Sequence, residues 1–178
     1  SRRLRTLRVG ACDRVGTDAR RHGAGRPGSA LRPRADDAGE SMTAALHQRV
    51  LAYLGEHRVM TLATQGRDGP WAAAVFYASE GFDLYFLSSP STRHCADLSE
   101  NPRVAATIQE DYADWSQIRG VQLEGVARSL AGAEAAHARE LYGAKFPIVG
   151  KLAQAPAAIV EAFAKIRWYR VVPERLYF

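Results

Sequence analysis

Short apolar runs separated by glycine turns, between residues 59 and 88, place the strongest constraint on the fold of this chain. Each run is six to eight residues long and carries β-branched or aromatic side chains, which favours β-strands. In the third run Phe82, Leu84 and Phe86 share one face. Because the connections are short, we expect neighbouring strands to be antiparallel. The predicted strands are 59–64, 71–78 and 82–88, with turns at Asp68-Gly69-Pro70 and Glu80-Gly81.

The remainder of the chain supplies three more strands and several helices. Thr43 is a suitable helix cap, because an apolar stripe with Leu46, Val50 and Leu54 follows it. The predicted elements are a helix over 44–57, a short helix from Pro90 to Asn101, a strand over 104–109, a polar loop over 110–118, a strand over 120–130, helices over 133–145 and 157–165, and a strand over 166–172 stopped by Pro173. A small antiparallel sheet removes its edges by closing. We therefore predict a mainly β fold with flanking helices, built on a six-stranded antiparallel barrel.

Charge divides the chain into two parts. Residues 1–41 contain ten arginines and five acidic residues, whereas residues 42–178 contain equal numbers of basic and acidic residues. The first part has no aromatic side chain and no apolar periodicity, so we predict a disordered tail rich in Arg, Gly and Pro. A targeting peptide and sequence upstream of the natural start remain open for it, with Met42 as a candidate initiator. The neutral second part argues against nucleic acid as a partner.

Several other classes of protein find no support in the sequence. Of the two cysteines, Cys12 lies in the tail, so a reducing compartment and a cytoplasmic location are the simplest interpretation. His94 and Cys95 are adjacent, but no second pair of ligands follows at the spacing of a zinc site. The chain has neither the Gly-x-Ser-x-Gly motif of serine hydrolases nor a Gly-rich dinucleotide loop. No apolar run reaches the roughly 18 residues of a membrane helix.

Hydroxyl and basic side chains gather between the third strand and the short helix. The segment reads Leu87-Ser88-Ser89-Pro90-Ser91-Thr92-Arg93-His94. Free N–H groups at a helix start, together with hydroxyls and a guanidinium, favour a phosphate site. The alternative is an ordinary helix start, capped by Ser91 or Thr92, with Arg93 as a solvated surface charge. The pattern alone leaves both interpretations open.

The order of motifs around this segment resembles the flavin-binding split-barrel family typified by pyridoxamine-phosphate oxidase. After the hydroxyl and basic residues comes a helix with Leu98 that ends in Asn101-Pro102-Arg103-Val104-Ala105. The chain is most similar to a subgroup of short bacterial members, through Thr92-Arg93-His94, Ile118-Arg119-Gly120-Val121-Gln122, Phe146-Pro147 and Ala155-Pro156. The resemblance covers about residues 44–172, nearly the whole folded part.

This resemblance implies a homodimer with two FMN molecules between its subunits, and residues 42–178 as the flavin-binding domain. The implied contacts to the phosphate and ribityl chain are Leu87, Ser88, Ser89, Thr92, Arg93 and His94. The second strand presents its backbone to the isoalloxazine ring at Ala74, Val75, Phe76 and Tyr77, and Gly120, Val121 and Gln122 take the matching place on the fifth strand. Trp115 or Trp168 covers the ring from the partner subunit, or packs in the core or dimer interface.

Two departures from the family pattern bear on function. The second strand has no Arg or Lys, so Arg93, aided by hydroxyls and His94, would balance nearly all of the phosphate charge. The Arg-x-His substrate motif of the oxidase is absent, which argues against pyridoxamine phosphate as the substrate. The resemblance thus implies an FMN-dependent oxidoreductase acting on an unidentified small molecule or a reduced nicotinamide. The alternatives are a flavin- or haem-binding carrier or sensor without turnover, and a reductase that uses a deazaflavin.

Overall fold

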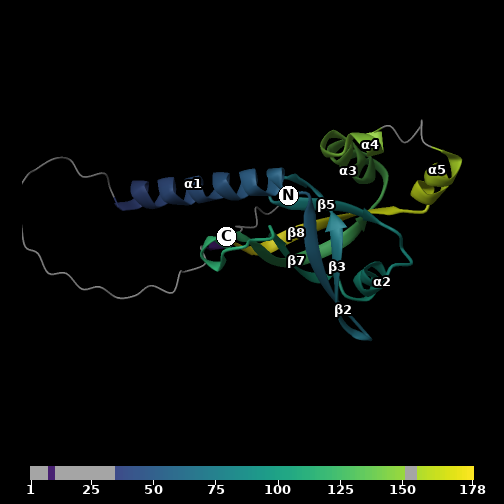
Figure 1. Cartoon of the computed structure of the whole chain (residues 1–178), viewed down its shortest axis with the longest axis horizontal. Helices are drawn as coiled ribbons and strands as arrows, with labels where there is room; N and C mark the ends of the chain where they lie inside the picture. Colours follow the sequence, from purple (N-terminus) through teal and green to yellow (C-terminus); the bar gives the residue numbers. More distant parts are fainter. Residues whose placement is uncertain (1–7, 11–34, 151–155) are drawn as a thin grey trace, which may run out of the picture.

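The computed structural model describes residues 8–10, 35–150 and 156–178 (Figure 1). The strands are β1 (Arg8–Gly10), β2 (Val59–Gly66), β3 (Gly69–Phe76), β4 (Ala78–Glu80), β5 (Asp83–Ser88), β6 (Arg103–Gln109), β7 (Gly120–Leu130) and β8 (Arg167–Tyr177). The helices are α1 (Ala35–Glu56), α2 (Arg93–Glu100), the 3-10 turn η1 (Trp115–Gln117), α3 (Gly132–Lys145), α4 (Pro147–Gly150) and α5 (Ala157–Ala164).

One curved sheet contains all of these strands. Its order is β3-β2-β6-β7-β8-β5-β4, all antiparallel, and β1 adds a short parallel pairing to the end of β8. The two edge strands of this order, β3 and β4, are consecutive in the chain, with only Tyr77 between them. The chain therefore passes directly from one edge of the sheet to the other, which folds the sheet back on itself as a split barrel.

Tyr77 holds this passage between the two edges in place. Its side chain is fully buried, and its hydroxyl donates to the carbonyl oxygen of Leu54 at 2.9 Å. Its backbone N–H donates to the carbonyl oxygen of Arg58 at 2.9 Å. The Lys145 ammonium lies 4.4 Å from the centre of the Tyr77 ring. The end of α1 and the end of α3 are thus both fixed at the point where the barrel closes.

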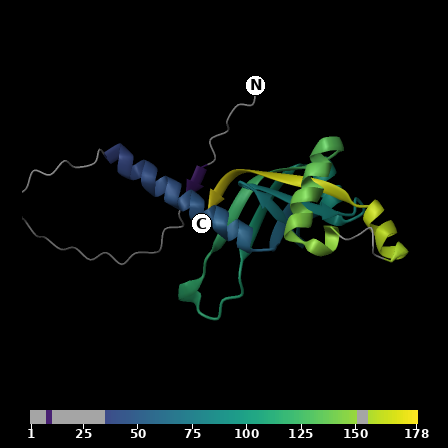
Figure 2. The same cartoon turned by 90° about the horizontal axis from the view of Figure 1, so that it is seen from above.

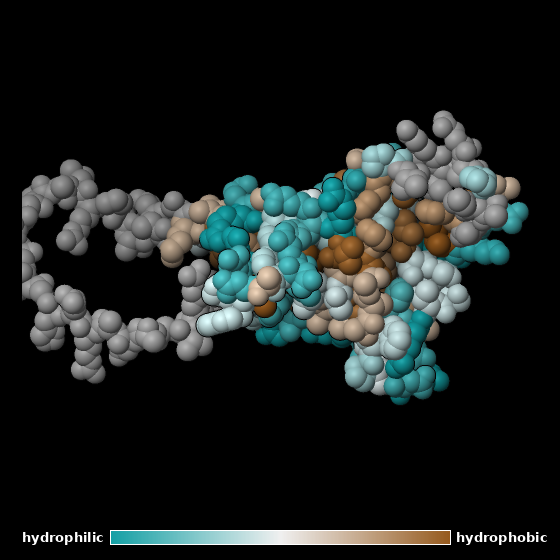
Figure 3. All heavy atoms as spheres, viewed as in Figure 1, coloured by the Kyte–Doolittle hydropathy of each residue, from teal (hydrophilic) through white to brown (hydrophobic). Residues whose placement is uncertain are grey.

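Two hydrophobic cores lie on opposite sides of the sheet. The larger fills the barrel and includes Leu54, Leu62, Phe86 and Val171, all fully buried. The smaller packs α3 against the outside of the sheet through residues such as Tyr85, Tyr142 and Trp168. Figure 3 shows hydrophobic residues gathered where the strands meet α3. Because side chains alternate along a strand, β5 contributes Phe86 to the first core and Tyr85 to the second.

The mainly β, antiparallel split-barrel fold is confirmed, with differences in detail. The described residues form eight strands rather than six, because β1 is added and the predicted second strand divides at Tyr77 into β3 and β4. The prediction that Pro173 stops the last strand is wrong. The register of β7 and β8 shifts at Glu124/Gly125, opposite Pro173, and such an irregularity accommodates a residue without an N–H group.

The N-terminal part of the chain also differs from expectation. Helix α1 begins at Ala35, nine residues before the predicted start and before Met42. Within the predicted tail, Arg8–Gly10 pairs with Arg175–Tyr177 of β8. Residues 1–7 and 11–34 lie outside the described residues, as do residues 151–155, which include the Ala155 of a family motif. No described helix is both long and apolar enough to cross a membrane.

Candidate cofactor site

The segment from Ser88 to His94 connects β5 to α2 and leaves the start of α2 open. Thr92 occupies the cap position, with φ −73° and ψ 149°, but its side chain makes no capping hydrogen bond. Its hydroxyl donates instead to the carbonyl oxygen of Ser89 at 2.8 Å. The first turn of α2 contains no acidic residue. The N–H groups of that turn therefore keep the partial positive charge that attracts an anion.

Three of the predicted phosphate contacts form one hydrogen-bond network. The Nε2 atom of His94 lies 2.8 Å from the Ser88 hydroxyl and 3.2 Å from the Thr92 hydroxyl. His94 is buried, with 8% of its surface exposed. If His94 carries its proton on Nε2, it donates to both oxygens, and the Ser88 O–H is then available to a ligand. The network fixes these hydroxyls at the entrance to α2.

Arg93 is held against the hairpin that joins β2 to β3. Its Nη2 atom donates to the carbonyl oxygen of Asp68 at 3.0 Å, and its guanidinium carbon lies 4.6 Å from the centre of the Trp71 ring. Its Nε atom is buried and has no hydrogen-bond partner. An unpaired buried donor of this kind costs about 1–3 kcal/mol. Arg93 therefore combines a fixed position with an N–H group that a phosphate oxygen would satisfy.

Sequence reasoning missed the residues that support this loop from below. The Thr64 hydroxyl donates to the buried Asp97 carboxylate at 2.7 Å, which ties α2 to β2. Burial acts to raise the pKa of the Cys95 thiol, but hydrogen bonds from neighbouring polar side chains outweigh burial and lower it to about 7. Tyr169 of β8 is one of these neighbours. Of the segments that contact this loop, the sequence pattern indicated only the Asp68-Gly69-Pro70 turn. It gave no indication that Arg93 contacts that turn.

The residues of the second strand that were predicted to contact the isoalloxazine ring divide into exposed and buried ones. Ala74 and Phe76 are exposed on the edge strand β3, and Phe76 packs edge to face on Phe146 with ring centres 5.6 Å apart. Val75 is buried in the barrel core. Tyr77 follows the strand and uses its N–H group on Arg58. Residues 74–76 therefore form the part of this stretch that offers unpaired edge backbone.

Within one chain, the predicted contacts on the fifth strand are far from the loop. Ser88 pairs with Arg167 at the start of β8, whereas Gln122 pairs with Tyr177 at its end. Ten residues of strand separate these positions, which is roughly 30 Å. Gly120 and Val121 adjoin Gln122 and share its distance. A single chain therefore does not bring these residues to Ser88.

The two candidate tryptophans have opposite environments. Trp168 is buried in the outer core, where its ring lies 5.4 Å from that of Tyr142. Trp115 is 87% exposed on η1, in the loop that projects from the sheet between β6 and β7 (Figure 2). Leu87 is partly buried and packs with the outer core as well. Trp115 is thus the tryptophan that is free to reach another molecule.

A metal site finds no basis in the residues that the structure describes, since these contain no group of three or more His, Cys, Asp or Glu side chains placed to hold an ion. The site combines an open helix start, fixed hydroxyls and one guanidinium, on an edge of a split barrel. This set of donors fits the phosphate of FMN.

Comparisons with known proteins agree with this architecture. The chain is 33% identical over 103 residues to a UPF0306 protein of Photorhabdus laumondii, which covers 57% of this chain and 72% of that protein. Its fold is similar to HutZ, the haem storage protein of Vibrio cholerae, with a TM-score of 0.59 and 20% identity over 72% of this chain and 91% of that one. A candidate pyridoxamine 5'-phosphate oxidase from Listeria innocua gives a TM-score of 0.57 and 20% identity over 74% and 95% of the two chains. Residues 46–178 match the family described as pyridoxamine 5'-phosphate oxidase, and the chain therefore belongs to that family, within a subgroup of short bacterial members.

Proposed function

We propose that residues 42–178 form an FMN-dependent oxidoreductase that acts on a small molecule as a homodimer. The observation that carries this proposal is the start of α2, where no side chain caps the helix and the buried Nε of Arg93 has no partner. The family to which the chain belongs supports a flavin as the ligand of such a site.

Each part of the loop has a role in holding the cofactor. The phosphate binds the first-turn N–H groups of α2, the Ser88, Ser89 and Thr92 hydroxyls, and Arg93. Buried His94 positions the Ser88 and Thr92 hydroxyls. Leu87 lies beside the ribityl chain. The edge backbone of residues 74–76 holds the isoalloxazine ring, since half of the N–H and C=O groups of an edge strand have no strand partner.

A second subunit completes the site. By their register in the sheet, residues 120–122 lie too far from Ser88 to share a ligand with it in one chain. In a dimer that places these residues beside the partner's β3, Trp115 covers the flavin ring. The exposed apolar side chains of β3, Trp71 and Phe76, are 42% and 56% exposed and supply a surface for such an interface.

Bound FMN supplies the hydride and electron transfer, and the protein orients it and limits the access of water. The chain therefore needs no strong acid or base of its own at the ring. Because β3 has no Arg or Lys, Arg93 supplies nearly all of the charge that balances the phosphate, aided by the hydroxyls and His94.

Purification from a flavin-replete host tests this proposal. We expect a yellow protein with a flavin spectrum, one FMN per chain, a dimer by sedimentation, and oxidation of NADH or NADPH when a suitable acceptor is present. A colourless protein that does not take up added FMN would contradict cofactor binding. A fully loaded monomer would contradict the shared site.

A second candidate is storage or sensing of haem without turnover. The similarity in fold to the haem storage protein HutZ favours it. A Soret band after incubation with haem, together with the absence of FMN uptake, would replace the flavin proposal by this one. A deazaflavin reductase is a third outcome, recognised by uptake of the deazaflavin in preference to FMN.

A further inference from the structure

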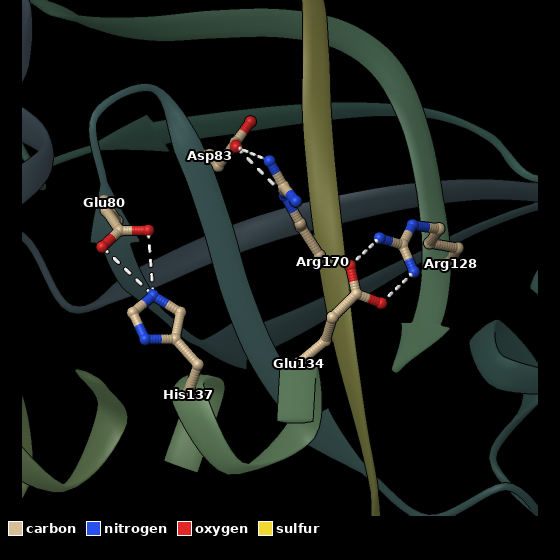
Figure 4. Close-up of polar contacts among 6 residues, drawn as sticks. All are labelled: Glu80, Asp83, Arg128, Glu134, His137 and Arg170. Atoms are coloured by element: carbon tan, nitrogen blue, oxygen red, sulfur yellow. Dashed lines mark hydrogen bonds and ion pairs between the residues drawn. The ribbon is translucent and has the colours of Figure 1, made fainter. Parts of the chain in front are cut away.

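A polar pocket of about 330 Å³ lies on the outside of the sheet, beside α3 and away from the α2 loop. Its floor is formed by Tyr85 of β5, with Leu130 and Ala133 as apolar neighbours. Charged side chains form its walls: Glu80 from β4, Glu134 and His137 from α3, and Arg170 from β8. Figure 4 shows these charged residues with their partners. The volume is at the lower end of the range for small-molecule sites.

Three carboxylates lie in or beside this pocket, since Glu80 and Glu134 line it and Asp83 is the partner of the lining residue Arg170. Two of the three are paired with a guanidinium. Arg170 donates from Nε to Asp83 at 3.0 Å, and its Nη2 atom also contacts that carboxylate. Arg128 makes two hydrogen bonds to Glu134, at 2.8 and 2.6 Å. In the described chain Glu80 has no such partner, and its two carboxylate oxygens lie 3.1 and 3.0 Å from Nε2 of His137 (Figure 4).

The pocket and its partners therefore have one carboxylate more than they have guanidiniums. The lining residues and the side chains that pair with them contribute three carboxylates and two guanidiniums, and the carboxylate without a guanidinium is Glu80. The side chains of Glu80 and His137 are 52% and 48% exposed, so a ligand from solvent reaches both. One cationic group at Glu80 would restore neutrality and leave the two guanidinium pairs intact.

Aromatic rings stand next to this carboxylate. The rings of Tyr85 and His137 meet edge to face, with centres 6.2 Å apart, and form a corner at the pocket. Burial raises the pKa of Tyr85, so its hydroxyl stays protonated at neutral pH. The Tyr85 ring is 4% exposed, and the guanidinium carbon of Arg170 already lies 5.8 Å from its centre. The preference for a cation therefore rests on the Glu80 carboxylate, and the apolar lining of Leu130 and Ala133 favours an organic cation over a bare metal ion.

We propose that this pocket binds a small organic amine in its ammonium form, with the nitrogen at the Glu80 carboxylate and the carbon skeleton against Tyr85 and Leu130. The proposal does not depend on the flavin site, because Tyr85 lies on the opposite face of β5 from Phe86, which supports the α2 loop.

A charge series on one skeleton tests the proposal on the unmodified protein. Titrations of benzylamine, benzyl alcohol and benzoate are followed by calorimetry and by NMR. We expect saturable binding of benzylamine, with binding of benzyl alcohol at least about tenfold weaker because the ionic hydrogen bond is lost. Benzoate should not bind. Equal binding of the neutral or anionic compound, or no binding of benzylamine, would overturn the proposal.

Matched variants then locate the site. Glu80→Gln keeps the shape of the side chain and should weaken benzylamine binding about tenfold. Glu124→Gln removes an exposed carboxylate of β7 that contacts Arg175, and should leave binding unchanged. An equal loss in both variants would indicate a general charge effect and reject the pocket. FMN content, measured on the same samples, should be unaltered, which separates this test from that of the flavin site.

Discussion

Adjacent residues of β5 support two polar sites of opposite character. Phe86 points into the barrel below the α2 loop, where its ring is 6.4 Å from that of His94. Tyr85 points outward and forms the floor of the pocket beside α3. The α2 loop has donors in excess, including the unpartnered Nε of Arg93. The α3 pocket has acceptors in excess, since Glu80 lacks a guanidinium partner in the described chain.

A small barrel keeps two polar sites distinct by resting them on different cores. The α2 loop rests on the fully enclosed core, and its side chains are fixed mainly by hydrogen bonds among hydroxyl groups, the His94 imidazole and a backbone carbonyl. The α3 pocket rests on the smaller outer core, and the ion pairs Arg128–Glu134 and Arg170–Asp83 hold its charged side chains next to solvent. Loss of buried packing should therefore destabilise the α2 loop most, whereas added salt should weaken the α3 pocket most.

Removal of the Phe86 ring, which supports the α2 loop, should have the largest effect on stability. Phe86 is fully buried and stacks on Tyr169 at 5.0 Å, so Phe86→Ala should lower the free energy of unfolding by about 3–5 kcal/mol. Urea unfolding monitored by circular dichroism measures the loss. Tyr85→Phe, which keeps a ring in the outer core, is the matched control and should change stability by less than about 1.5 kcal/mol. Similar losses in both variants would remove the distinction between the two cores.

Arg93 should control the affinity for flavin and not the fold. Arg93→Ala is expected to weaken FMN binding by about 1.5–3 kcal/mol, because it removes a charged donor from the phosphate. Fluorescence titration of the apoprotein with FMN measures this. Arg67 lies in the adjacent β2–β3 hairpin, pairs with Glu100 at 3.0 Å and is 85% exposed, so Arg67→Ala should leave the dissociation constant unchanged. An unaltered affinity in Arg93→Ala would reject the assignment of the phosphate site.

The loop should also respond to pH through Cys95. Its pKa is about 7 in the folded chain and about 9 when unperturbed, so between these values the unfolded state binds a proton that the folded state does not. The free energy of unfolding should therefore rise from about pH 7 to about pH 9, and this contribution should be lost below pH 7.

Comparison of the wild type with Cys95→Ala isolates that effect. Burial lowers the pKa of Lys145 to about 8, so Lys145 contributes to the pH dependence of both proteins. The difference between their unfolding free energies, measured below, within and above the window, belongs to Cys95. A constant difference across the window would show that the thiol does not change its protonation there.

The smallest effect is expected at the α3 pocket. The Arg128 and Glu134 side chains are about half exposed, so their pair should contribute less than about 1 kcal/mol to stability. Arg128→Ala should show this small loss in dilute buffer and almost none at about 1 M salt, where charges are screened within a few ångströms. A loss that persists at high salt would mean that Arg128 acts by packing instead of by charge.

Much of the fold followed from local patterns in the sequence. The predicted strand at Phe82–Ser88 corresponds to β5 within one residue, and the helix end at Asn101-Pro102 corresponds to the end of α2. Two boundaries within the sheet were predicted wrongly because distant residues determine them. Strand β8 continues past Pro173 because β7 shifts register beside it, and the second strand ends at Tyr77 because that side chain turns into the barrel.

The candidate site was only partly visible in the sequence. The segment from Ser88 to His94 was identified from its residue types and its place after a strand. The partners of Arg93, which are the Asp68 carbonyl and the Trp71 ring, come from a hairpin that no local pattern connects to α2. The pocket beside α3 was not foreseen, since Glu80 and His137 are 57 residues apart in the chain.

Side-chain periodicity and contiguous motifs were enough to predict the class of the fold, its family resemblance and the hydroxyl and basic residues of the α2 loop. Which donors and acceptors lack a matching partner depends instead on how distant segments pack. The Nε of Arg93 is orphaned by the hairpin that packs over it, and Glu80 is left with an imidazole by the position of α3. Both depend on contacts between segments far apart in the chain, where burial and pairing set the cost of each polar group.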